Sequence, residues 1–316
     1  MKTIVTLTLN PAIDIACEAD EVRHTHKVRT FGERLEPGGG GINVARALTS
    51  LGAPARAIYL AGGHTGQVLD GLLDAHGIER TAIRIAGDTR VSLNVFERAS
   101  GHEYRFVPEG PCVTEAEWRA CLDAMRAVEA EYVVASGSLS ECLPDDFYAQ
   151  LGAGLSKRGV RYLLDTSGEE LEASLRQGGV YLVKPSRGEL EQLVGRRLTT
   201  LEAVADAASK IVAKGAAAHV AVTLGQDGAM LVNAEGASLI RALTVETRSA
   251  VGAGDSFLAG MTYGLASGAA IGEAFRMGMA AGAAAVEAAG TELCSRAAVD
   301  RLLPQVPEAQ AVSLSG

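Results

Sequence analysis

Residues 249–256 read SAVGAGDS and carry groups suited to the transfer of a phosphoryl group. Gly252, Ala253 and Gly254 directly precede a helical pattern, and consecutive backbone N–H groups at the start of a helix form an anion site. Asp255 follows at once, and a carboxylate beside such a site could take a proton from a hydroxyl that attacks a phosphate. The helix dipole also favours the ionised carboxylate, so we expect Asp255 to be a weak base before the reaction begins.

A purely structural interpretation of the same stretch is open. The glycines could serve only a tight turn into a core helix, with Asp255 at the positive end of the helix dipole. Phe257, Met261 and Leu265 recur every four residues, which predicts a helix face buried in the core. The chain has no GxxxxGK[ST] motif, so a bound phosphate would depend on the amides of 252–254 instead of a Walker-type loop.

Two further motifs place polar groups beside glycines or at a strand end. Residues 36–48 read EPGGGGINVARAL, where four glycines allow a ligand to approach the backbone and Asn43 offers a donor and an acceptor. The GxGxxG spacing of dinucleotide sites is missing. Asp14 closes the motif NPAID, where its carboxylate could bind two adjacent sugar hydroxyls or only cap a turn.

Short apolar runs alternate with helical patterns over much of the chain, and this order predicts an α/β fold with a central, mostly parallel sheet and helices on both faces. We expect a single domain over 1–316, with ligands at the carboxyl ends of the strands. The pattern is helical over 254–303, with a long alanine-rich helix near 271–289, and the tail at 304–316 lacks periodicity, so we expect it to be frayed. The expected strands are residues 3–9, 56–62, 131–137, 160–168, 180–186 and 219–225.

Two segments interrupt the alternation, at about 14–35 and 89–107, because they are extended and no helix follows them. They predict a small β-sheet lid in which Val91, Leu93 and Val95 share one face. An apolar outer face on a thin sheet is costly in water, so we expect a second subunit to cover it in a homodimer. The alternative is that the lid folds back on its own domain.

The composition is typical of a globular enzyme that acts on a small molecule. Of the 316 residues, 47% are hydrophobic and 4% aromatic, and the net charge is −9, which argues against a nucleic-acid surface. No run approaches the ~18 apolar residues of a membrane helix, and the N-terminus has no cleavage site, so we expect a cytoplasmic protein without membrane contact. The cysteines lack CxxC spacing and are odd in number, which argues against a disulfide framework and a zinc site. They are Cys17, Cys112, Cys121, Cys142 and Cys294.

In their order and spacing, EPGGGGINVARA, NPAID, SGSL, KPS, TLG and VGAGDS resemble the motifs of the PfkB branch of the ribokinase-like sugar kinases. The resemblance extends from residue 1 to about 303 and implies a ribokinase-like fold. GGGGINVARA and the stretch ASGHEYRFV at 99–107 are most similar to the members that act on fructose 6-phosphate. That similarity implies that the 1-hydroxyl of fructose 6-phosphate receives a phosphoryl group from MgATP to give fructose 1,6-bisphosphate.

Three alternatives to this activity stay open. Members of the family that phosphorylate tagatose 6-phosphate or fructose 1-phosphate usually carry Lys where this sequence has Gly40. Gly40 argues against both, although discrimination between epimers depends on a few hydrogen bonds that the sequence does not place. A non-catalytic sensor of sugar phosphate or ATP is the third alternative, and Asp255 argues against it because a binding module needs no base.

The resemblance also implies a role for each matching position. Asp255 would be the base, with the amides of Gly252, Ala253, Gly254 and Asp255 as the anion hole. The sugar would contact Asp14, Gly39, Gly40 and Asn43, and its distal phosphate Lys27, Arg29, Arg90 and Ser138, with Lys27 and Arg90 the strongest candidates. ATP would contact Lys184, Ser186, Thr223, Gly225, Gly228 and Ser249. Glu189 would arrange Mg²⁺ through water. Potassium would bind the backbone carbonyls of Ser249, Val251, Ala285, Ala288, Gly290 and Glu292.

Three positions depart from the family pattern. Ser186 stands where the NxxE motif has Asn, so we expect a different affinity or geometry for magnesium. Gly188 replaces a residue that is often Lys, which removes a contact to the ATP phosphates. After Ser138 and Leu139, Ser-Glu-Cys replaces the usual Pro-Pro-Gly, which could loosen the loop near the sugar phosphate. None of these changes touches Asp255, so we expect weaker binding before any loss of chemistry.

Overall fold

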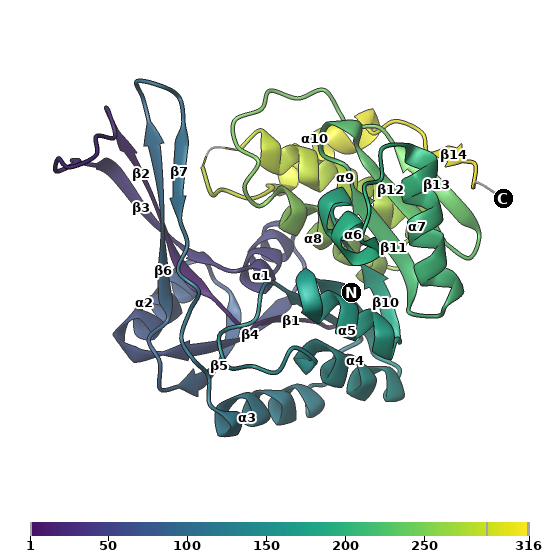
Figure 1. The fold of residues 1–316 in the computed structure, drawn as a ribbon, viewed down its shortest axis with the longest axis horizontal. Coiled ribbons are helices and arrows are strands. Elements are labelled where there is room, and N and C mark those ends of the chain that lie inside the picture. Colours follow the sequence, from purple (N-terminus) through teal and green to yellow (C-terminus); the bar gives the residue numbers. More distant parts are fainter. Residues whose placement is uncertain (1, 289, 315–316) are drawn as a thin grey trace.

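The computed structural model describes residues 2–288 and 290–314. A large sheet lies between two layers of helices, and a smaller sheet projects to one side of it (Figure 1). The predicted α/β fold with a mostly parallel central sheet and a small second sheet is confirmed.

The large sheet has ten strands in the order β14-β13-β12-β11-β10-β9-β8-β1-β4-β5. Its parallel strands are β1 (Ile4–Thr8), β4 (Ala55–Gly62), β5 (Glu79–Ile85), β8 (Tyr132–Ser136), β9 (Arg161–Asp165), β10 (Val180–Val183) and β11 (Ala217–Thr223). The antiparallel strands are β12 (Ala229–Asn233), β13 (Gly236–Ile240) and β14 (Gln310–Val312). All six predicted strands are therefore present. The prediction of a frayed tail is wrong at 310–312, because this short segment pairs with β13.

Helices cover both faces of the large sheet because its strands alternate their side chains between two cores. Val5 and Leu7 of β1 belong to one buried cluster, whereas Ile4 belongs to another. The first cluster is covered by α3 (Glu115–Arg126), α4 (Phe147–Lys157), α5 (Gly168–Gln177), α6 (Arg187–Val194) and α7 (Leu201–Ala213). The other face is covered by α1 (Gly40–Ser50), α2 (Gly63–Ala75), α8 (Ala253–Ala266), α9 (Ile271–Val286) and α10 (Arg296–Leu302). Two short 3₁₀ turns occupy Gly225–Asp227 and Leu303–Gln305.

Helix α8 is fixed in the core, as its four-residue spacing predicts. Phe257, Met261 and Leu265 are each at most 4% exposed and belong to the same buried cluster. Gly260 allows α9 to pack closely against α8, since a Cβ at this glycine would lie 2.6 Å from the carbonyl oxygen of Met277. The start of α8 is therefore held by a tightly packed helix pair.

The smaller sheet is built from the two segments that interrupt the alternation. Its strands follow the order β3 (Phe31–Gly38), β2 (Ala12–Ala19), β6 (Arg90–Glu97) and β7 (Glu103–Phe106). We call these strands and their connecting loops the lid. Figure 1 shows the lid standing apart from the helices of the main body, with the loop between β2 and β3 at its far end.

The two faces of the lid differ in chemistry. Strand register places Leu35, Ile15, Leu93 and Phe106 in one row across the four strands, on the face opposite to Asp14. Leu35 is 44% and Phe106 57% exposed. We call this row, with Val91, the apolar lid face.

Part of the apolar lid face is covered by its own chain. Val95 is 6% exposed and packs with Cys17, Ala19 and two residues of the β2–β3 loop, Val22 and Val28. Folding of the lid onto itself thus accounts for the far end of this face. In the row nearer the main body, Leu35 and Phe106 are exposed, whereas Ile15 and Leu93 are half-buried.

Candidate active site

Two cavities meet at the segment that leads into α8. The first, of about 310 Å³, is lined by polar groups from the lid, α1 and the start of α8; we call it the polar cavity. The second, of about 570 Å³, has a predominantly apolar lining; we call it the apolar cavity. Ala250 lines both cavities, with Gly252 and Asp255 on the polar side and Ala253 and Gly254 on the apolar side. Residues 250–255 are therefore the wall that separates them.

The backbone of this wall depends on glycine at position 252. Gly252 is the N-cap of α8 and has a φ of 73°, in the left-handed region that glycine adopts at low cost. A Cβ there would lie 2.4 Å from the Leu293 side chain. The first N–H groups of α8 have no partners within the helix and suit an anion at this point.

Asp255 is held at the polar cavity by a residue of α1. The Nδ2 of Asn43 donates to the Oδ2 of Asp255 at 2.9 Å, which connects two motifs that lie 212 residues apart in the sequence. Burial raises the pKa of Asp255, and the charges of Asp165 and Asp14 add to the rise. The hydrogen bond from Asn43 and the charge of Lys184 oppose it, and the net pKa is about 7. The expectation of a weak base is therefore wrong, because desolvation outweighs the helix dipole.

Lys184 brings a positive charge to the same place. Its Nζ lies 3.0 Å from the Oδ1 of Asp165, and the Lys184 side chain is 7% exposed. A Cβ on Gly254 would lie 3.4 Å from this Nζ, so the ammonium group sits against the start of α8. Burial lowers the pKa of Lys184, but the neighbouring Asp165 more than offsets this, and the net direction is upward. Asp165 lies near the end of the expected strand 160–168 but belongs to none of the motifs, and its pairing with Lys184 depends on a neighbouring strand.

Asp14 lies in the polar cavity among positive charges. Burial raises the pKa of its carboxyl, opposed by Arg90, Arg105 and Arg46. Gly38 must be glycine for this approach, because a Cβ there would lie 2.1 Å from the Oδ2 of Asp14. The β2–β3 pairing thus places the carboxylate directly over the glycine motif.

The glycine motif itself packs against the strand ends. Gly39 lines the polar cavity. A Cβ on Gly40 would lie 2.3 Å from the Oγ of Ser136, so a lysine at this position would require rearrangement of the β8 end.

The cations of the polar cavity are only partly those expected from the sequence. Arg90 lines it and is held by its Nη1 donating to the Pro108 carbonyl at 2.8 Å and its Nη2 to the Asn10 carbonyl at 2.9 Å. Arg105 also lines it and was not predicted. Arg105 pairs with Asn94 in the β6–β7 hairpin, and both side chains line the cavity. The alternation of side chains in ASGHEYRFV was therefore the signal that could have placed Arg105 on the cavity face. Ser92, too, was missed.

Lys27, Arg29 and Ser138 do not line the polar cavity of this chain. Lys27 and Arg29 are exposed in the β2–β3 loop at the far end of the lid. Ser138 is exposed after β8, and its Oγ accepts from the Nδ2 of Asn10 at 3.4 Å. Their contacts with a sugar phosphate stay predictions.

The loop after Ser138 is fastened, contrary to the expectation that Ser-Glu-Cys loosens it. The Oγ of Ser140 donates to the Leu9 carbonyl at 2.9 Å, and the Glu141 carbonyl accepts from the N–H of Val113 at 2.9 Å. Cys142 forms a disulfide with Cys112. The prediction against disulfides is wrong for this pair, because the spacing of 30 residues does not reveal that the two loops meet beside the same strand end.

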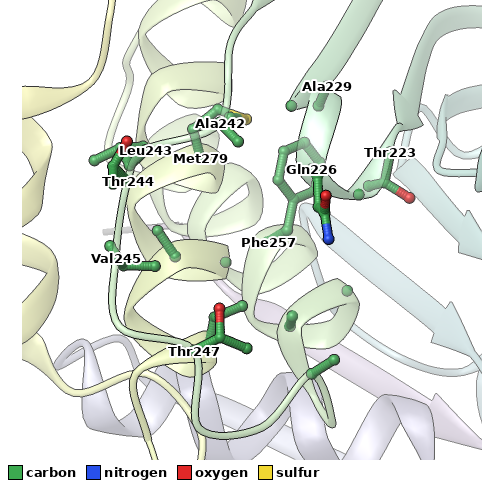
Figure 2. Close-up of a pocket in the computed structure, with 18 residues that line it drawn as sticks. Thr223, Gln226, Ala229, Ala242, Leu243, Thr244, Val245, Thr247, Phe257 and Met279 are labelled. Carbon is green, nitrogen blue, oxygen red and sulfur yellow. The ribbon is translucent and has the colours of Figure 1, made fainter.

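The apolar cavity is lined by three of the six residues predicted to bind a nucleotide, whereas Lys184, Ser186 and Ser249 do not line it. Thr223, Gly225 and Gly228 line it, and Gly228 must be glycine because a Cβ there would lie 2.0 Å from the Ile240 carbonyl oxygen. Figure 2 shows Leu243, Val245 and Thr247 along one wall, opposite Thr223 and Gln226, with Phe257 between them. The residues that the sequence did not single out are Gln226, Ala229, Ala242, Leu243, Thr244, Val245, Thr247, Met279, Gly282, Ala283 and Val286, most of them small or apolar without a motif.

Ser186 and Glu189 form a capping box at the start of α6. The N–H of Ser186 donates to the Oε2 of Glu189 at 2.7 Å, and the Oγ of Ser186 accepts from the N–H of Glu189 at 3.2 Å. The negative charge of Glu189 also helps to raise the pKa of Asp165. Asp165 and Glu189 are thus two carboxylates near Lys184, and carboxylate oxygens are the ligands that Mg²⁺ prefers. Gly188 is exposed, and a side chain there would meet open space.

The two segments predicted to bind potassium lie side by side. The N–H groups of Arg248 and Ser249 donate to the Val286 carbonyl at 2.9 and 3.3 Å. This places Ser249 and Val251 beside the end of α9, which contains Ala285 in its last turn. Ala288, Gly290 and Glu292 follow the helix in the sequence. Carbonyl groups at the end of a helix carry partial negative charge and suit a cation.

Comparison with known proteins gives the same family that the motifs suggest. The profile of the pfkB family carbohydrate kinases matches residues 7–298. The ATP-dependent 6-phosphofructokinase isozyme 2 of Mycobacterium tuberculosis is 40% identical over 307 residues, which cover 96% of this chain and 90% of that protein. The 1-phosphofructokinase of Bacillus subtilis is 31% identical, over 81% of this chain and 84% of that protein.

Solved structures of one relative match over nearly the whole chain. Phosphofructokinase-2 from Escherichia coli in complex with fructose-6-phosphate has a TM-score of 0.91 at 39% identity, covering 97% of this chain and 99% of that one. The same protein in complex with potassium gives 0.93 at 40% identity, with 96% and 99% covered. A tetrameric inhibited form of it gives 0.91 at 39% identity, with 96% and 99% covered.

Proposed function

This chain belongs to the pfkB family of carbohydrate kinases, and we propose that it transfers the terminal phosphoryl group of ATP to the 1-hydroxyl of fructose 6-phosphate. The observation that carries this proposal is the shared wall of the two cavities, residues 250–255. A sugar phosphate in the polar cavity and a nucleotide in the apolar cavity would approach each other at the start of α8. Asp255 and the first amides of α8 are the groups at that point.

The chemistry at the wall follows from its charges. With a pKa of about 7, Asp255 is ionised in a large fraction of molecules at neutral pH and accepts the proton of the attacking hydroxyl. Lys184 and the amides of 252–255 stabilise the negative charge on the phosphoryl group as it moves. The products are ADP and fructose 1,6-bisphosphate.

The sugar phosphate is held by charges on the lid side of the polar cavity. Asp14 accepts hydrogen bonds from sugar hydroxyls, and Asn43 offers an amide next to Asp255. Arg90 and Arg105 bind the distal phosphate, since guanidinium groups pair with phosphate oxygens in two parallel hydrogen bonds. In an acidic protein these two arginines make the cavity selective for an anionic sugar.

Two cations complete the proposed site. Mg²⁺ would neutralise charge on the ATP phosphates, and Glu189, whose orientation the capping box with Ser186 fixes, would hold it through water. Potassium would bind the backbone carbonyls predicted for it, and the potassium complex of the E. coli relative supports this proposal. These are the carbonyls of Ser249, Val251, Ala285, Ala288, Gly290 and Glu292. The role of potassium would be to fix the wall at the base of the anion site.

The substrate is tested by the rate of ADP formation with MgATP and each of fructose 6-phosphate, tagatose 6-phosphate and fructose 1-phosphate, with and without potassium. We expect the highest kcat/KM with fructose 6-phosphate, and stimulation by potassium. A preference for fructose 1-phosphate, the substrate class suggested by the name of the B. subtilis relative, would overturn the choice of substrate. Absence of turnover with all three sugars would overturn the kinase assignment.

We also propose that two copies of the chain pair through the apolar lid face. Val91, Leu35 and Phe106 are 36%, 44% and 57% exposed, and strand register places Leu93 in the same face. An exposed apolar row on a thin sheet is stabilised when a second copy covers it. The tetrameric form of the E. coli relative shows that related chains assemble, so larger oligomers are a further outcome of the test.

The pairing is tested by sedimentation of a Leu93→Asp variant. A charge in the centre of the apolar lid face should shift the protein to monomers. The matched control is Val68→Asp, because Val68 is 44% exposed on α2, outside the lid. An unchanged sedimentation profile for Leu93→Asp would reject this interface.

A further inference from the structure

Arg46 is a buried cation with no role in the chemistry described above. It lies on α1, one turn beyond Asn43, and 9% of its side-chain surface is exposed. Burial lowers its pKa, and the carboxylates of Glu36, Asp14 and Asp255 oppose this effect. Removing a guanidinium from water is costly, and a buried ion pair is weak evidence of a gain in stability. Its contacts therefore call for another explanation.

The contacts of Arg46 form a chain that ends at the catalytic carboxyl. Arg46 pairs with Glu36, and its Nη1 donates to the Pro37 carbonyl at 3.0 Å and to the Oδ1 of Asn43 at 3.4 Å. His76 contacts the same carboxylate oxygen as Arg46, with its Nε2 3.0 Å from the Oε2 of Glu36. Asn43 then donates from Nδ2 to Asp255 at 2.9 Å.

This order of groups allows one orientation of the Asn43 amide. A guanidinium only donates hydrogen bonds, and an ionised carboxylate only accepts them. An amide between the two must turn its oxygen to Arg46 and its nitrogen to Asp255. With the amide reversed, a carbonyl oxygen would face the carboxylate and an NH₂ group would face the guanidinium, and both contacts would be repulsive.

We propose that Arg46 is a positioning residue for phosphoryl transfer. It locks the amide of Asn43 so that the Nδ2 of Asn43 donates to the Oδ2 of Asp255, and the Oδ1 of Asp255 is left free to face the substrate hydroxyl. This proposal rests on the proposed function, in which Asp255 is the base. In this proposal, the arginine of the motif GGGGINVARA orients the base through Asn43 and does not itself touch the reacting atoms.

The charges around Asp255 come from four elements. Asp165 is the last residue of β9, Lys184 follows β10, Asp14 belongs to β2 and Arg46 to α1. Loss of Arg46 removes a positive charge and releases the amide, and both changes destabilise the carboxylate. A merely structural arginine would affect folding without changing the acidity of Asp255.

The experiment compares wild type with Arg46→Gln and with the double variant Glu36→Gln/Arg46→Gln, which leaves no unpaired charge if the single variant folds poorly. The first readout is the pKa of the Asp255 carboxyl in the ligand-free protein, followed by ¹³C NMR and assigned with Asp255→Asn. We expect it to rise by about one unit in Arg46→Gln, and by less in the double variant, where loss of the Glu36 charge offsets the loss of the Arg46 charge and only the release of the amide remains. The second readout is turnover of fructose 6-phosphate, where kcat should fall up to about a hundredfold while KM changes little.

Arg80→Gln is the matched control, because Arg80 is also a partly buried arginine in an ion pair, with Asp74, and lies on β5 away from both cavities. It should leave the Asp255 pKa and kcat unchanged. An unchanged Asp255 pKa in the Arg46 variants, or a loss confined to KM, would overturn the proposal. Since the NMR readout needs no substrate, it decides the role of Arg46 even if wild type fails to turn over fructose 6-phosphate, an outcome that counts against the proposed function alone.

Discussion

At the scale of the residue, the acidity of Asp255 is a balance between its surroundings. Burial and Asp165 raise its pKa, and Asn43 and Lys184 restrain the rise. The result, about 7, places the group where a general base is most effective at neutral pH. A carboxyl with an ordinary pKa near 4 would hold the hydroxyl but gain little from taking its proton.

The pH dependence of kcat/KM for fructose 6-phosphate should show this shift. Only the ionised form of Asp255 accepts a proton, so activity is present above the raised pKa and is lost as the pH falls through it. We expect an acid limb with a midpoint near pH 7, falling about tenfold per pH unit below it. A midpoint near 4 would show that Asp255 is not desolvated in the working enzyme.

Sequence motifs identify the site residues that lie within a glycine-rich motif or close to a strand end. Asp255, Asn43, Asp14 and Arg90 were named from the sequence, and all of them line the polar cavity. Arg105 was missed because its place depends on the register of a hairpin. The same limit applies to Lys184 and Asp165: the first was found through its motif, and its partner lies on a neighbouring strand.

At the scale of the element, the loops after β8 and before α3 form one fastened unit. Cys142 has a φ of 67°, a strained value for a side chain larger than glycine. It stands at the glycine of the family's usual Pro-Pro-Gly, and its disulfide to Cys112 holds the loop there. Asn10 joins this unit to the substrate side, because its Nδ2 donates to the Glu109 and Leu139 carbonyls while its own carbonyl accepts from Arg90.

Removal of this disulfide should destabilise the protein and lower its affinity for the sugar phosphate. For a separation of 30 residues, loss of the crosslink costs about 3–4 kcal/mol in the chain-entropy model. A Cys112→Ser/Cys142→Ser variant should unfold at lower urea concentration and show a raised KM for fructose 6-phosphate with kcat nearly unchanged.

Thiol titration of the denatured protein provides the control for that prediction. We expect three reactive thiols before reduction, from Cys17, Cys121 and Cys294, and five after it. A dithiol reductant should reproduce the effect of the double substitution in wild type and add nothing to the variant. Five thiols without reductant would contradict the presence of the crosslink.

Most strands with a continuous apolar run could be predicted, and strands defined by their partner could not. An exception is β12, whose run AMLV is apolar and buried but was not among the expected strands. The buried strands β1, β4, β8, β9, β10 and β11 were all expected. Strand β5 was not, since ERTAIRI alternates charged and apolar residues at a sheet edge. Strand β14 has three residues and exists because β13 offers an unpaired edge.

At the scale of the whole molecule, the main body carries the wall and the lid carries the charges that face it. Asp14, Arg90 and Arg105 come from the lid, whereas Asp255 comes from α8, which α9 holds in the core. The polar cavity therefore exists only where the two parts meet. Within the described residues, no helix has the length and apolar character needed to cross a membrane.

The general arrangement followed from the sequence, and its details did not. Alternation of strands and helices predicted the sheet, and the interrupting segments predicted the lid. Which charges of the lid reach the cavity depends on strand register, as the contrast between Arg105 and Lys27 shows. The cover of the apolar lid face depends on how its own loop folds back over Val95.

The central claim is that Asp255, at the wall between the two cavities, serves the transfer step and not the binding of either ligand. Calorimetric titration of Asp255→Asn with fructose 6-phosphate and with a non-hydrolysable ATP analogue, beside a single-turnover measurement with MgATP, tests it most directly, with Asp74→Asn on the remote face of α2 as control. We predict affinities close to wild type for both ligands and transfer slowed by about 10²–10⁴-fold. Transfer at a rate near that of wild type would contradict the account.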